Sequence, residues 1–247
     1  NKQVFDSIRF SKYVQEALLP KMDHLGHQFS DAFFHLKQKD IIGGDLPFIM
    51  KMGKKTFTAA IDCTGHGVSG AMLSVMAYSL LNDTIRSLEG KSLGEVVTYF
   101  NQRFMSSFKS REMSMFGLEM VICAYSEDSE DLEYCSAGRP FFQMKKGQII
   151  KHKKEKYGIG FKLNTQYESN FLKVEKDDIF YLFSDGIVDQ FGQVTNKKFR
   201  EKNLIKLLQS MHYLQMQKQK EIIEDMITSW QGSEEQTDDQ LIIGFKI

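Results

Sequence analysis

Four aspartate positions share a setting in which a side chain can reach a site without being covered by its neighbours. Each stands beside glycines or at the end of a predicted strand. They are Asp45 in Ile-Gly-Gly-Asp, Asp62 in Ile-Asp-Cys-Thr-Gly-His-Gly, Asp185 in Leu-Phe-Ser-Asp-Gly, and Asp238 or Asp239 in Gln-Thr-Asp-Asp-Gln. The runs before Asp62 and Asp185 are apolar, so these carboxylates come at the ends of buried strands. We therefore treat the set as one candidate polar site.

Converging carboxylates need positive charge. At 4 Å and an effective dielectric constant of 20, each like-charged pair costs roughly 4 kcal/mol. No Lys/Arg cluster lies beside these positions in the sequence, which predicts divalent cations, and an all-oxygen ligand set favours Mg²⁺ or Mn²⁺ over Zn²⁺. Two such ions would clamp a phosphoryl group and lower the pKa of a shared water. The chemistry predicted is phosphate-ester hydrolysis without a covalent enzyme intermediate.

A plainer interpretation exists for each aspartate alone. Asp before Gly is a common turn dipeptide, because Asp accepts hydrogen bonds from the following backbone amides. The stretch after Asp62 is harder to explain as a turn, since Gly65, Gly67 and Gly70 surround a predicted helix start. Glycines there indicate close approach of the backbone to another group.

Composition describes an ordinary globular protein. The 247 residues include 32 Lys+Arg, 32 Asp+Glu and 42% hydrophobic residues, so disorder is excluded and there is no excess of positive charge for binding nucleic acid. Three cysteines without CxxC spacing argue against a disulfide scaffold or zinc site. No apolar run approaches the roughly 20 residues of a membrane helix. We expect a cytoplasmic segment without membrane contact, cut from a longer chain because it begins with Asn1.

Hydrophobic periodicity predicts one α+β domain. Residues 4–19 are expected to form an amphipathic helix closed by Pro20, and Ser69 is expected to cap the helix that follows the glycines. The other predicted elements are a strand at 31–36, a hairpin at 48–62 turning at 53–55, helices at 71–85, 93–108, 202–211 and 216–230, an antiparallel meander of strands at 119–125, 132–136, 141–144 and 148–150, and strands at 178–183 and 241–247.

The ordered motifs resemble those of the SpoIIE/RsbU-type branch of the PPM metal-dependent serine/threonine protein phosphatases. The resemblance extends from about Tyr13 to the C-terminus. It rests on Gly43-Gly44-Asp45, Asp62-Cys63-Thr64-Gly65-His66-Gly67 leading into Gly70-Ala71-Met72, Ala137-Gly138, Leu182-Phe183-Ser184-Asp185-Gly186, Asp189-Gln190-Phe191-Gly192 and Asp238-Asp239.

This resemblance implies a PPM-type αββα sandwich, in which helices flank two antiparallel sheets, with a two-metal site at one end. Asp62 would bridge two Mn²⁺ or Mg²⁺ ions and the Cys63 carbonyl would bind one. Asp45, Asp185 and Asp238 would complete the ligand set, with Asp239 as the alternative to its neighbour.

The resemblance also implies the organisation and partners of the protein. Residues 1–20 would be a linker or switch helix joined to an upstream sensor domain, and residues 21–247 the phosphatase domain. The substrate would be a phosphoserine or phosphothreonine on a regulatory protein, such as an antagonist of an anti-sigma factor.

The chain departs from the family pattern at three places. Glu119 stands where Asp is expected in Gly-Met-Asp, Arg139-Pro140 replaces an Asn-containing turn, and Tyr157 replaces a Pro. None removes a predicted carboxylate ligand. The departures motivate a second hypothesis, a catalytically degenerate phosphatase that binds a phosphoprotein as a regulatory module. A nucleotide cyclase, suggested by Gly-Gly-Asp, is disfavoured because Leu46-Pro47 follows.

Other candidate residues have competing interpretations. His66 could protonate the leaving oxygen or simply fill the turn at a helix start, and Arg139 could bind the substrate phosphate with two donors or be a solvated loop arginine. The cysteines are expected to be small core residues. The lysine-rich stretch 145–156 could receive an acidic partner or form a solvated hairpin face. The apolar stripe of the first helix could pack on its own domain or pair with a second copy in a homodimer.

Overall fold

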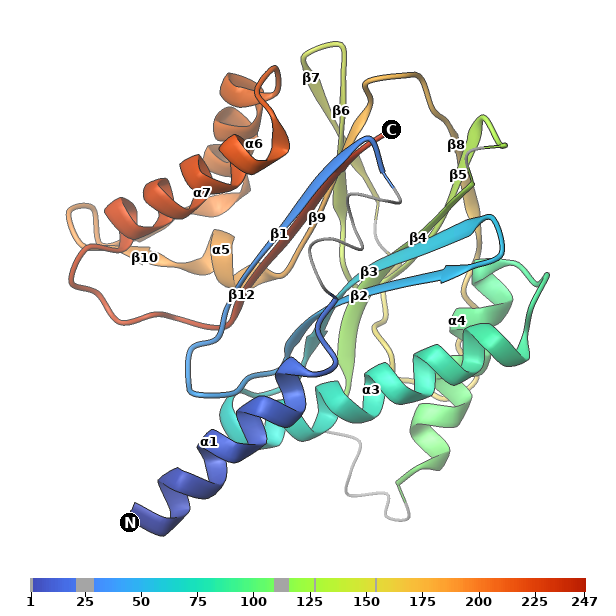
Figure 1. Ribbon diagram of the computed structural model, residues 1–247, viewed down its shortest axis with the longest axis horizontal. Helices are drawn as coiled ribbons and strands as arrows, with labels where there is room; N and C mark the ends of the chain where they lie inside the picture. Colours follow the sequence, from blue (N-terminus) through green and yellow to red (C-terminus); the bar gives the residue numbers. More distant parts are fainter. Residues whose placement is uncertain (1, 21–28, 109–115, 127, 154) are drawn as a thin grey trace.

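Two five-stranded antiparallel sheets lie face to face, and helices cover both outer faces (Figure 1). The computed structural model describes residues 2–20, 29–108, 116–126, 128–153 and 155–247. The first sheet has the order β1-β12-β9-β6-β7 and the second β2-β3-β4-β5-β8. This arrangement confirms the predicted αββα sandwich. The expected domain boundary at residues 20/21 adjoins residues 21–28, which lie outside the described residues.

The bounds of the elements follow from the backbone hydrogen bonds. The first sheet comprises β1 (Asp31–Lys37), β12 (Gln240–Lys246), β9 (Ile179–Phe183), β6 (Phe141–Lys145) and β7 (Gln148–His152). The second comprises β2 (Asp45–Met52), β3 (Lys55–Cys63), β4 (Leu118–Ser126), β5 (Asp131–Ala137) and β8 (Asn170–Lys173). A small ribbon pairs β10 (Phe191–Gly192) with β11 (Lys197–Lys198). The helices are α1 (Lys2–Glu16), α3 (Gly67–Ser87), α4 (Leu93–Ser106), α5 (Asp185–Asp189), α6 (Arg200–Met211) and α7 (Met216–Gln231).

Three apolar layers hold the sandwich together. Between the second sheet and the helices α3 and α4, fully buried Phe48, Leu81 and Phe100 meet. Between the two sheets lies an aromatic layer in which the Phe245 ring stacks on Phe29 at 4.4 Å and on Phe180 at 5.4 Å between centroids. The third layer joins the first sheet to α5, α6 and α7. Its large, fully buried side chains include Tyr181, Phe183, Phe142 and Phe33. Each sheet therefore buries both faces, which explains the nearly continuous apolar runs of β3 and β9.

The predicted meander is wrong in its last two strands. β4 and β5 pair in the second sheet, whereas β6 and β7 belong to the first, next to β9. The chain crosses between the sheets at Gly138, Arg139 and Pro140, and Gly138 adopts φ 83° at the start of the crossing. Alternation of apolar and polar residues predicts a strand but not the sheet that it joins.

The predicted cap of α3 is also wrong. The helix begins at Gly67 with His66 as its N-cap, without a side-chain cap, and Ser69 lies inside the first turn, where its Oγ donates to the His66 carbonyl at 3.3 Å. α4 instead has a complete capping box. The Ser92 side chain accepts from the Glu95 amide, and the Glu95 carboxylate accepts from the Ser92 amide at 3.1 Å.

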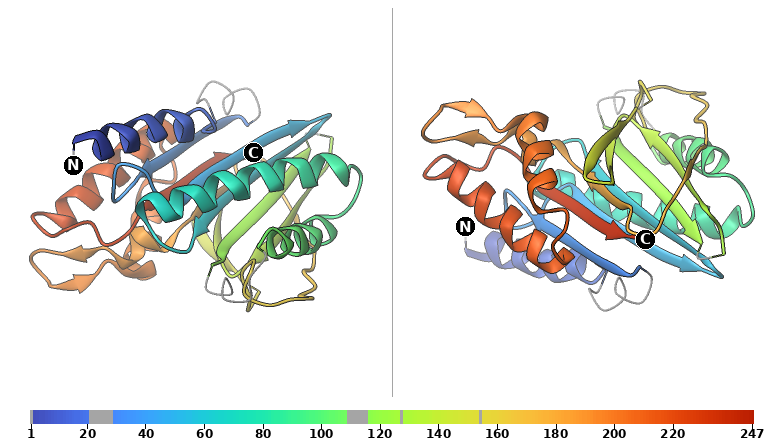
Figure 2. Two further views of the ribbon diagram at one scale, coloured as in Figure 1. Left: turned by 90° about the horizontal axis from the view of Figure 1, so that it is seen from below. Right: turned by 90° about the horizontal axis from the view of Figure 1, so that it is seen from above.

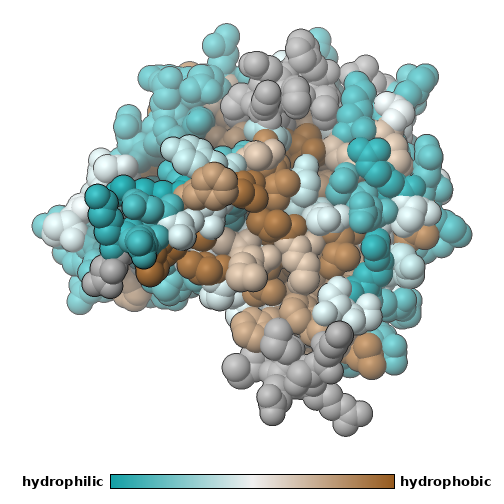
Figure 3. Space-filling model, turned by 60° about the horizontal axis from the view of Figure 1, so that its bottom comes forward, coloured by the Kyte–Doolittle hydropathy of each residue, from teal (hydrophilic) through white to brown (hydrophobic). Residues whose placement is uncertain are grey.

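α1 is the predicted N-terminal helix, and much of its apolar surface is exposed. Phe10 and Tyr13 are 70% and 69% exposed. α1 and α3 lie on the same side of the molecule (Figure 2), and apolar residues gather on the face seen in Figure 3. The stripe therefore does not pack fully on its own domain. One α1 residue is buried: Gln15 donates to the Gly43 carbonyl at 2.7 Å and to Ser74 Oγ at 2.9 Å. None of the helices in the described ranges combines the length and apolar character needed to cross a bilayer.

Candidate functional site

Three carboxylates form a row across adjacent strands at one end of the second sheet. Asp45 opens β2 and is paired in register with Asp62 near the end of β3, which is in turn paired with Glu119 near the start of β4. Side chains of directly opposed residues emerge on the same face of an antiparallel pair, with Cβ atoms about 5 Å apart. Like charges opposed in this way repel, so the row needs a compensating cation.

The first sheet brings two further carboxylates to the same end of the sandwich. Asp185 is the first residue of α5, separated from β9 by Ser184, and Asp238 lies exposed in the loop before β12. Both act electrostatically on Asp62. The neighbouring Ser184 donates its hydroxyl hydrogen bond to Asp45 Oδ2 at 2.5 Å and so links the two sheets at the site. The structure thus gathers Asp45, Asp62, Asp185 and Asp238 at one end of the sandwich.

Burial makes this negative charge costly. It raises the pKa of Asp45 well above its usual value, and the neighbouring Asp62 adds to that effect while the Ser184 hydrogen bond opposes it. Burial also raises the pKa of Asp62 to about 7, against the opposing charge of Arg139, and Asp185, among other carboxylates, raises it further. The local positive charge therefore does not fully neutralise the cluster.

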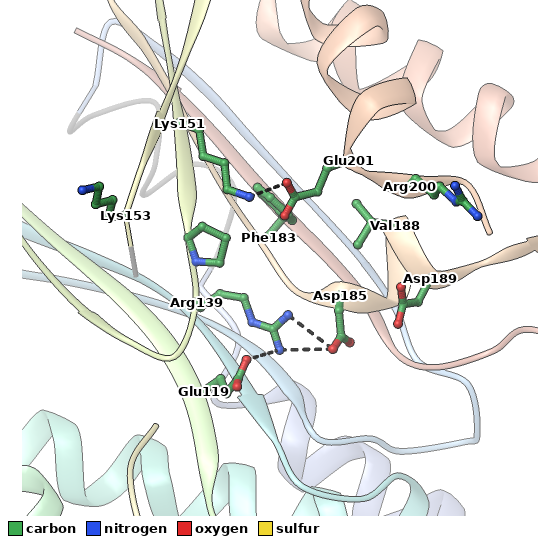
Figure 4. Close-up of a pocket in the computed structure, with 11 residues that line it drawn as sticks. Glu119, Arg139, Lys151, Lys153, Phe183, Asp185, Val188, Asp189, Arg200 and Glu201 are labelled. Atoms are coloured by element: carbon green, nitrogen blue, oxygen red, sulfur yellow. Dashed lines mark hydrogen bonds and ion pairs between the residues drawn. The ribbon is translucent and has the colours of Figure 1, made fainter. Parts of the chain in front are cut away.

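Arg139 supplies a cation that the local sequence did not reveal. It lies on the crossing from β5 to β6 and is only 7% exposed, which excludes the interpretation as a solvated loop arginine. Its Nη2 lies 2.5 Å from Asp62 Oδ2 and 2.9 Å from Glu119 Oε2, and its Nη1 lies 3.4 Å from Asp185 Oδ2. Figure 4 shows the guanidinium between Glu119 and Asp185. Arg139 thus supplies part of the positive charge that the sequence next to the aspartates did not indicate.

The adjacent aspartates Asp238 and Asp239 have different environments. Asp239 is 3% exposed, and its carboxylate accepts hydrogen bonds from the backbone amides of Lys39 at 2.7 Å and Gly44 at 2.6 Å. It fastens the turn that precedes β2. A Cβ at Gly43 would lie 2.3 Å from Asp239 Oδ2, so glycine is needed there. Asp238 keeps its carboxylate exposed, with Oδ1 accepting from the Asp239 amide at 2.8 Å.

Cys63 and His66 lie at the end of β3 and the start of α3. The Cys63 thiol is buried, and burial raises its pKa, in keeping with a small core residue. Its carbonyl oxygen would lie 2.8 Å from a Cβ at Gly44, so it faces the turn before β2. His66 Nδ1 pairs with Asp40 Oδ2 at 2.7 Å, and both side chains are about half exposed. Asp40 was not singled out from the sequence, because it lies in a polar loop without a strand or glycine signal of the kind that marked the other aspartates.

The donor set suits a hard divalent cation. Carboxylate oxygens from Asp45, Asp62, Asp185 and Asp238 are the ligands that Mg²⁺ and Mn²⁺ prefer. In the described part of the chain, however, no three Asp, Glu, His or Cys side chains are already arranged around one metal position. The guanidinium of Arg139 stands among the same oxygens.

A cavity of about 690 Å³ opens beside the carboxylates. Glu119 and Asp185 line one end of the cavity together with the guanidinium of Arg139. Lys153 and Arg200 also line the cavity (Figure 4). Two lysines of the predicted basic stretch, Lys151 and Lys153, line the cavity, and Lys151 is paired with Glu201 at 2.5 Å. Lys154 of that stretch lies outside the described residues.

Comparisons with known proteins agree with this geometry. A family model for stage II sporulation protein E (SpoIIE) matches residues 53–247. The SiaA-PP2C domain of Pseudomonas aeruginosa is similar in structure, with a TM-score of 0.88 at 21% identity, covering 100% of this chain and 97% of that one. A structure of the PP2C phosphatase domain with a regulatory fragment of SpoIIE from Bacillus subtilis gives 0.71 at 17%, covering 88% and 63%. RsbX in complex with magnesium gives 0.62 at 17%, covering 87% and 94%. No curated protein matches this chain in sequence.

Proposed function

The chain belongs to the SpoIIE family of PPM-type protein serine/threonine phosphatases, and from that premise we propose that it hydrolyses phosphoserine or phosphothreonine on a regulatory protein with two divalent metal ions. The observation that carries the proposal is the convergence of Asp45 and Asp62 from one sheet with Asp185 and Asp238 from the other. A carboxylate cluster of this density is costly unless cations bind it.

In this proposal Asp45, Asp62, Asp185 and Asp238 would hold the metals, and the Cys63 carbonyl would be a further ligand. When bound, Mg²⁺ or Mn²⁺ would supply Lewis-acid stabilisation of the phosphoryl oxygens and lower the pKa of a water molecule. RsbX, a structural relative, is in complex with magnesium, which supports this class of ion. Ser184 orients the Asp45 carboxylate through its hydrogen bond, and Asp239 positions the same strand start through the backbone of Gly44.

The cavity beside the aspartates is the proposed binding place for the phosphorylated segment. Arg139 would contact the phosphate, and Lys153 and Arg200 would attract acidic residues on either side of it. His66 remains the candidate general acid, and its bond to Asp40 would orient the ring.

The experiment measures release of phosphate from a phosphoserine protein and from a generic phosphate ester, with Mn²⁺ and with EDTA. We expect turnover only with metal and a loss of at least 100-fold in Asp62→Asn. The matched control is Asp128→Asn, an exposed aspartate beyond the opposite end of β4, which should retain full activity. Metal-independent turnover, or full activity of Asp62→Asn, would overturn the proposed mechanism.

A catalytically degenerate, phosphoprotein-binding module is the second candidate. The observation that favours it is the Arg139 guanidinium, which stands between Asp62 and Asp185 where a metal-loaded site needs free oxygens. The same assay decides: this candidate predicts phosphoprotein binding by the wild-type chain without any release of phosphate, with or without Mn²⁺.

We also propose that α1 connects the phosphatase domain, residues 21–247, to an upstream sensor domain. The exposed Phe10 and Tyr13 support a protein partner for this helix, either that sensor domain or α1 of a second copy. An anti-sigma-factor antagonist is the proposed type of substrate. Light scattering of wild-type protein and Phe10→Ser tests the homodimer, because only a dimer held through α1 would dissociate in the variant.

A further inference from the structure

We propose that Arg139 is the resident counter-cation of the carboxylate site in the metal-free protein, and that its guanidinium competes with divalent metal ions for the same oxygens. The inference rests on the proposed metal dependence. It adds that metal loading is an exchange of cations, in which Arg139 must leave Asp62 and Asp185 before the ions are fully coordinated.

The Arg139 guanidinium already occupies oxygens that the metal ions would need. Two of its three nitrogens are committed to three carboxylates, namely Asp62 at 2.5 Å, Glu119 at 2.9 Å and Asp185 at 3.4 Å. Asp62 and Asp185 are two of the proposed metal ligands, and they come from different sheets. A carboxylate oxygen that is 2.5 Å from a guanidinium nitrogen has no room for a metal ion on that side. The two cations therefore exclude each other at these oxygens.

The ion pairs do not have the features of a permanent structural bridge. A buried ion pair offsets its desolvation only when its remaining donors are also hydrogen-bonded, yet Arg139 Nε is buried without a hydrogen-bond partner among the described residues. An unsatisfied buried donor is costly. The guanidinium thus neutralises the aspartates but fits imperfectly among them, as expected for a group that holds the site in one of two states.

The backbone of Arg139 is fixed while its side chain has space to move. The carbonyl of Arg139 accepts a hydrogen bond from Ser136 Oγ at 2.7 Å. Gly138 packs so closely on Glu119 that a Cβ would lie 2.9 Å from its Cγ. The side chain borders the cavity of about 690 Å³, which continues toward Pro140 and Lys153. A displaced guanidinium can enter this space, where it would meet the substrate phosphate. In the metal-free protein Arg139 would therefore pair with the carboxylates, and in the metal-loaded protein it would pair with the substrate phosphate.

The first experiment measures Mn²⁺ affinity by calorimetry in the wild-type chain, Arg139→Met and Arg139→Lys. We expect Arg139→Met to bind Mn²⁺ at least tenfold more tightly, because the competitor is gone, and Arg139→Lys to lie between the two. Arg200→Met is the matched control. It removes the same charge from the same cavity, but among the described residues Arg200 makes no ion pair with the carboxylates, so its affinity should change less than twofold.

The second experiment follows thermal unfolding of the same variants. In EDTA, Arg139→Met should melt at a lower temperature than wild type, because the aspartates lose their cation, and saturating Mn²⁺ should close most of that gap. The third does not depend on whether Arg139→Met folds, and titrates wild-type protein with Mg²⁺. The ¹⁵N resonance of the Arg139 side-chain Nε–H group, assigned by its absence from the spectrum of Arg139→Lys, should shift during this titration.

The outcomes separate this inference from the proposed function. If wild type binds Mn²⁺ and Asp62→Asn does not, while Arg139→Met binds it equally or more weakly, competition is refuted and the metal site stands. An Arg139 resonance that does not move at saturating Mg²⁺ refutes the exchange in the same way. If neither wild type nor any Arg139 variant binds Mn²⁺, both the inference and the metal-dependent function are wrong.

Discussion

Replacing Asp239 by asparagine should destabilise the protein while leaving every proposed metal ligand in place. The buried carboxylate accepts two backbone hydrogen bonds, from Lys39 at 2.7 Å and Gly44 at 2.6 Å. Asparagine offers one oxygen, so one amide would face the new NH₂ group. Loss of one charge-assisted bond and one unsatisfied buried donor together cost about 3 kcal/mol. For a chain of this size that lowers the melting temperature by about 6 to 12 °C.

The assay is thermal and urea unfolding in EDTA, paired with Mn²⁺ titration. Asp238→Asn is the matched control, since in the described part of the chain its exposed carboxylate accepts a hydrogen bond from the neighbouring Asp239 amide alone. We expect its stability in EDTA to change by less than about 0.5 kcal/mol, while its Mn²⁺ affinity falls at least tenfold. Asp239→Asn should show the opposite pattern, in which stability in EDTA falls more than Mn²⁺ affinity does.

An Asp239→Asn protein as stable as wild type would refute this prediction. So would an Asp238→Asn variant less stable than Asp239→Asn. Either result would mean that the backbone of the turn before β2 is held by other contacts, and that the neighbouring aspartates do not divide their work as the hydrogen bonds indicate.

Three further predictions concern other parts of the molecule. Gly186→Ala places a Cβ 1.8 Å from the backbone carbonyl just before β12 and should cost about 3 kcal/mol in urea unfolding, whereas Gly53→Ala, in open space at φ 58°, should cost only about 1 kcal/mol. Gln15→Leu removes three buried hydrogen bonds, including the one that Gln15 Oε1 accepts from the Gly43 amide at 3.4 Å, and should cost about 2 kcal/mol by thermal melting; an unchanged melting temperature would show that α1 does not support the site. Burial lowers the pKa of His35 below 6.5 despite its bond to Glu224, so the unfolded chain binds more protons there and stability should fall as pH drops below about 6.5. His35→Gln should flatten this pH profile, and an identical slope in the variant would contradict the assignment.

Much of the fold follows from hydrophobic periodicity. The helix predicted at 216–230 is α7 at Met216–Gln231, and that predicted at 93–108 is α4 at Leu93–Ser106. Each of these helices buries one face, so its apolar residues recur with the helical period of 3.6 residues and can be recognised in the sequence. The hairpin predicted at 48–62 is β2–β3, turned at Gly53. Glycine with positive φ between two apolar runs is a local signal for such a turn.

Features that depend on contacts between distant parts of the chain could not be predicted from the sequence. The strand pattern of β6 is the same whichever sheet it joins, so the crossing at Arg139 was not visible, and a charged loop residue is ordinarily expected in solvent. Burial of that arginine results from the way the crossing brings it over Asp62. Similarly, nothing local distinguishes Asp238 from Asp239; their difference depends on a turn almost 200 residues earlier in the chain.

The aromatic layer between the sheets has a consequence for a site that it does not touch. Because Asp62 and Asp185 belong to different sheets, the thickness of the apolar layer between those sheets sets how far apart these two carboxylates stand. Phe29, Phe180 and Phe245 are part of that layer. A thinner or thicker aromatic layer would therefore change the separation of the carboxylates without changing any charged residue.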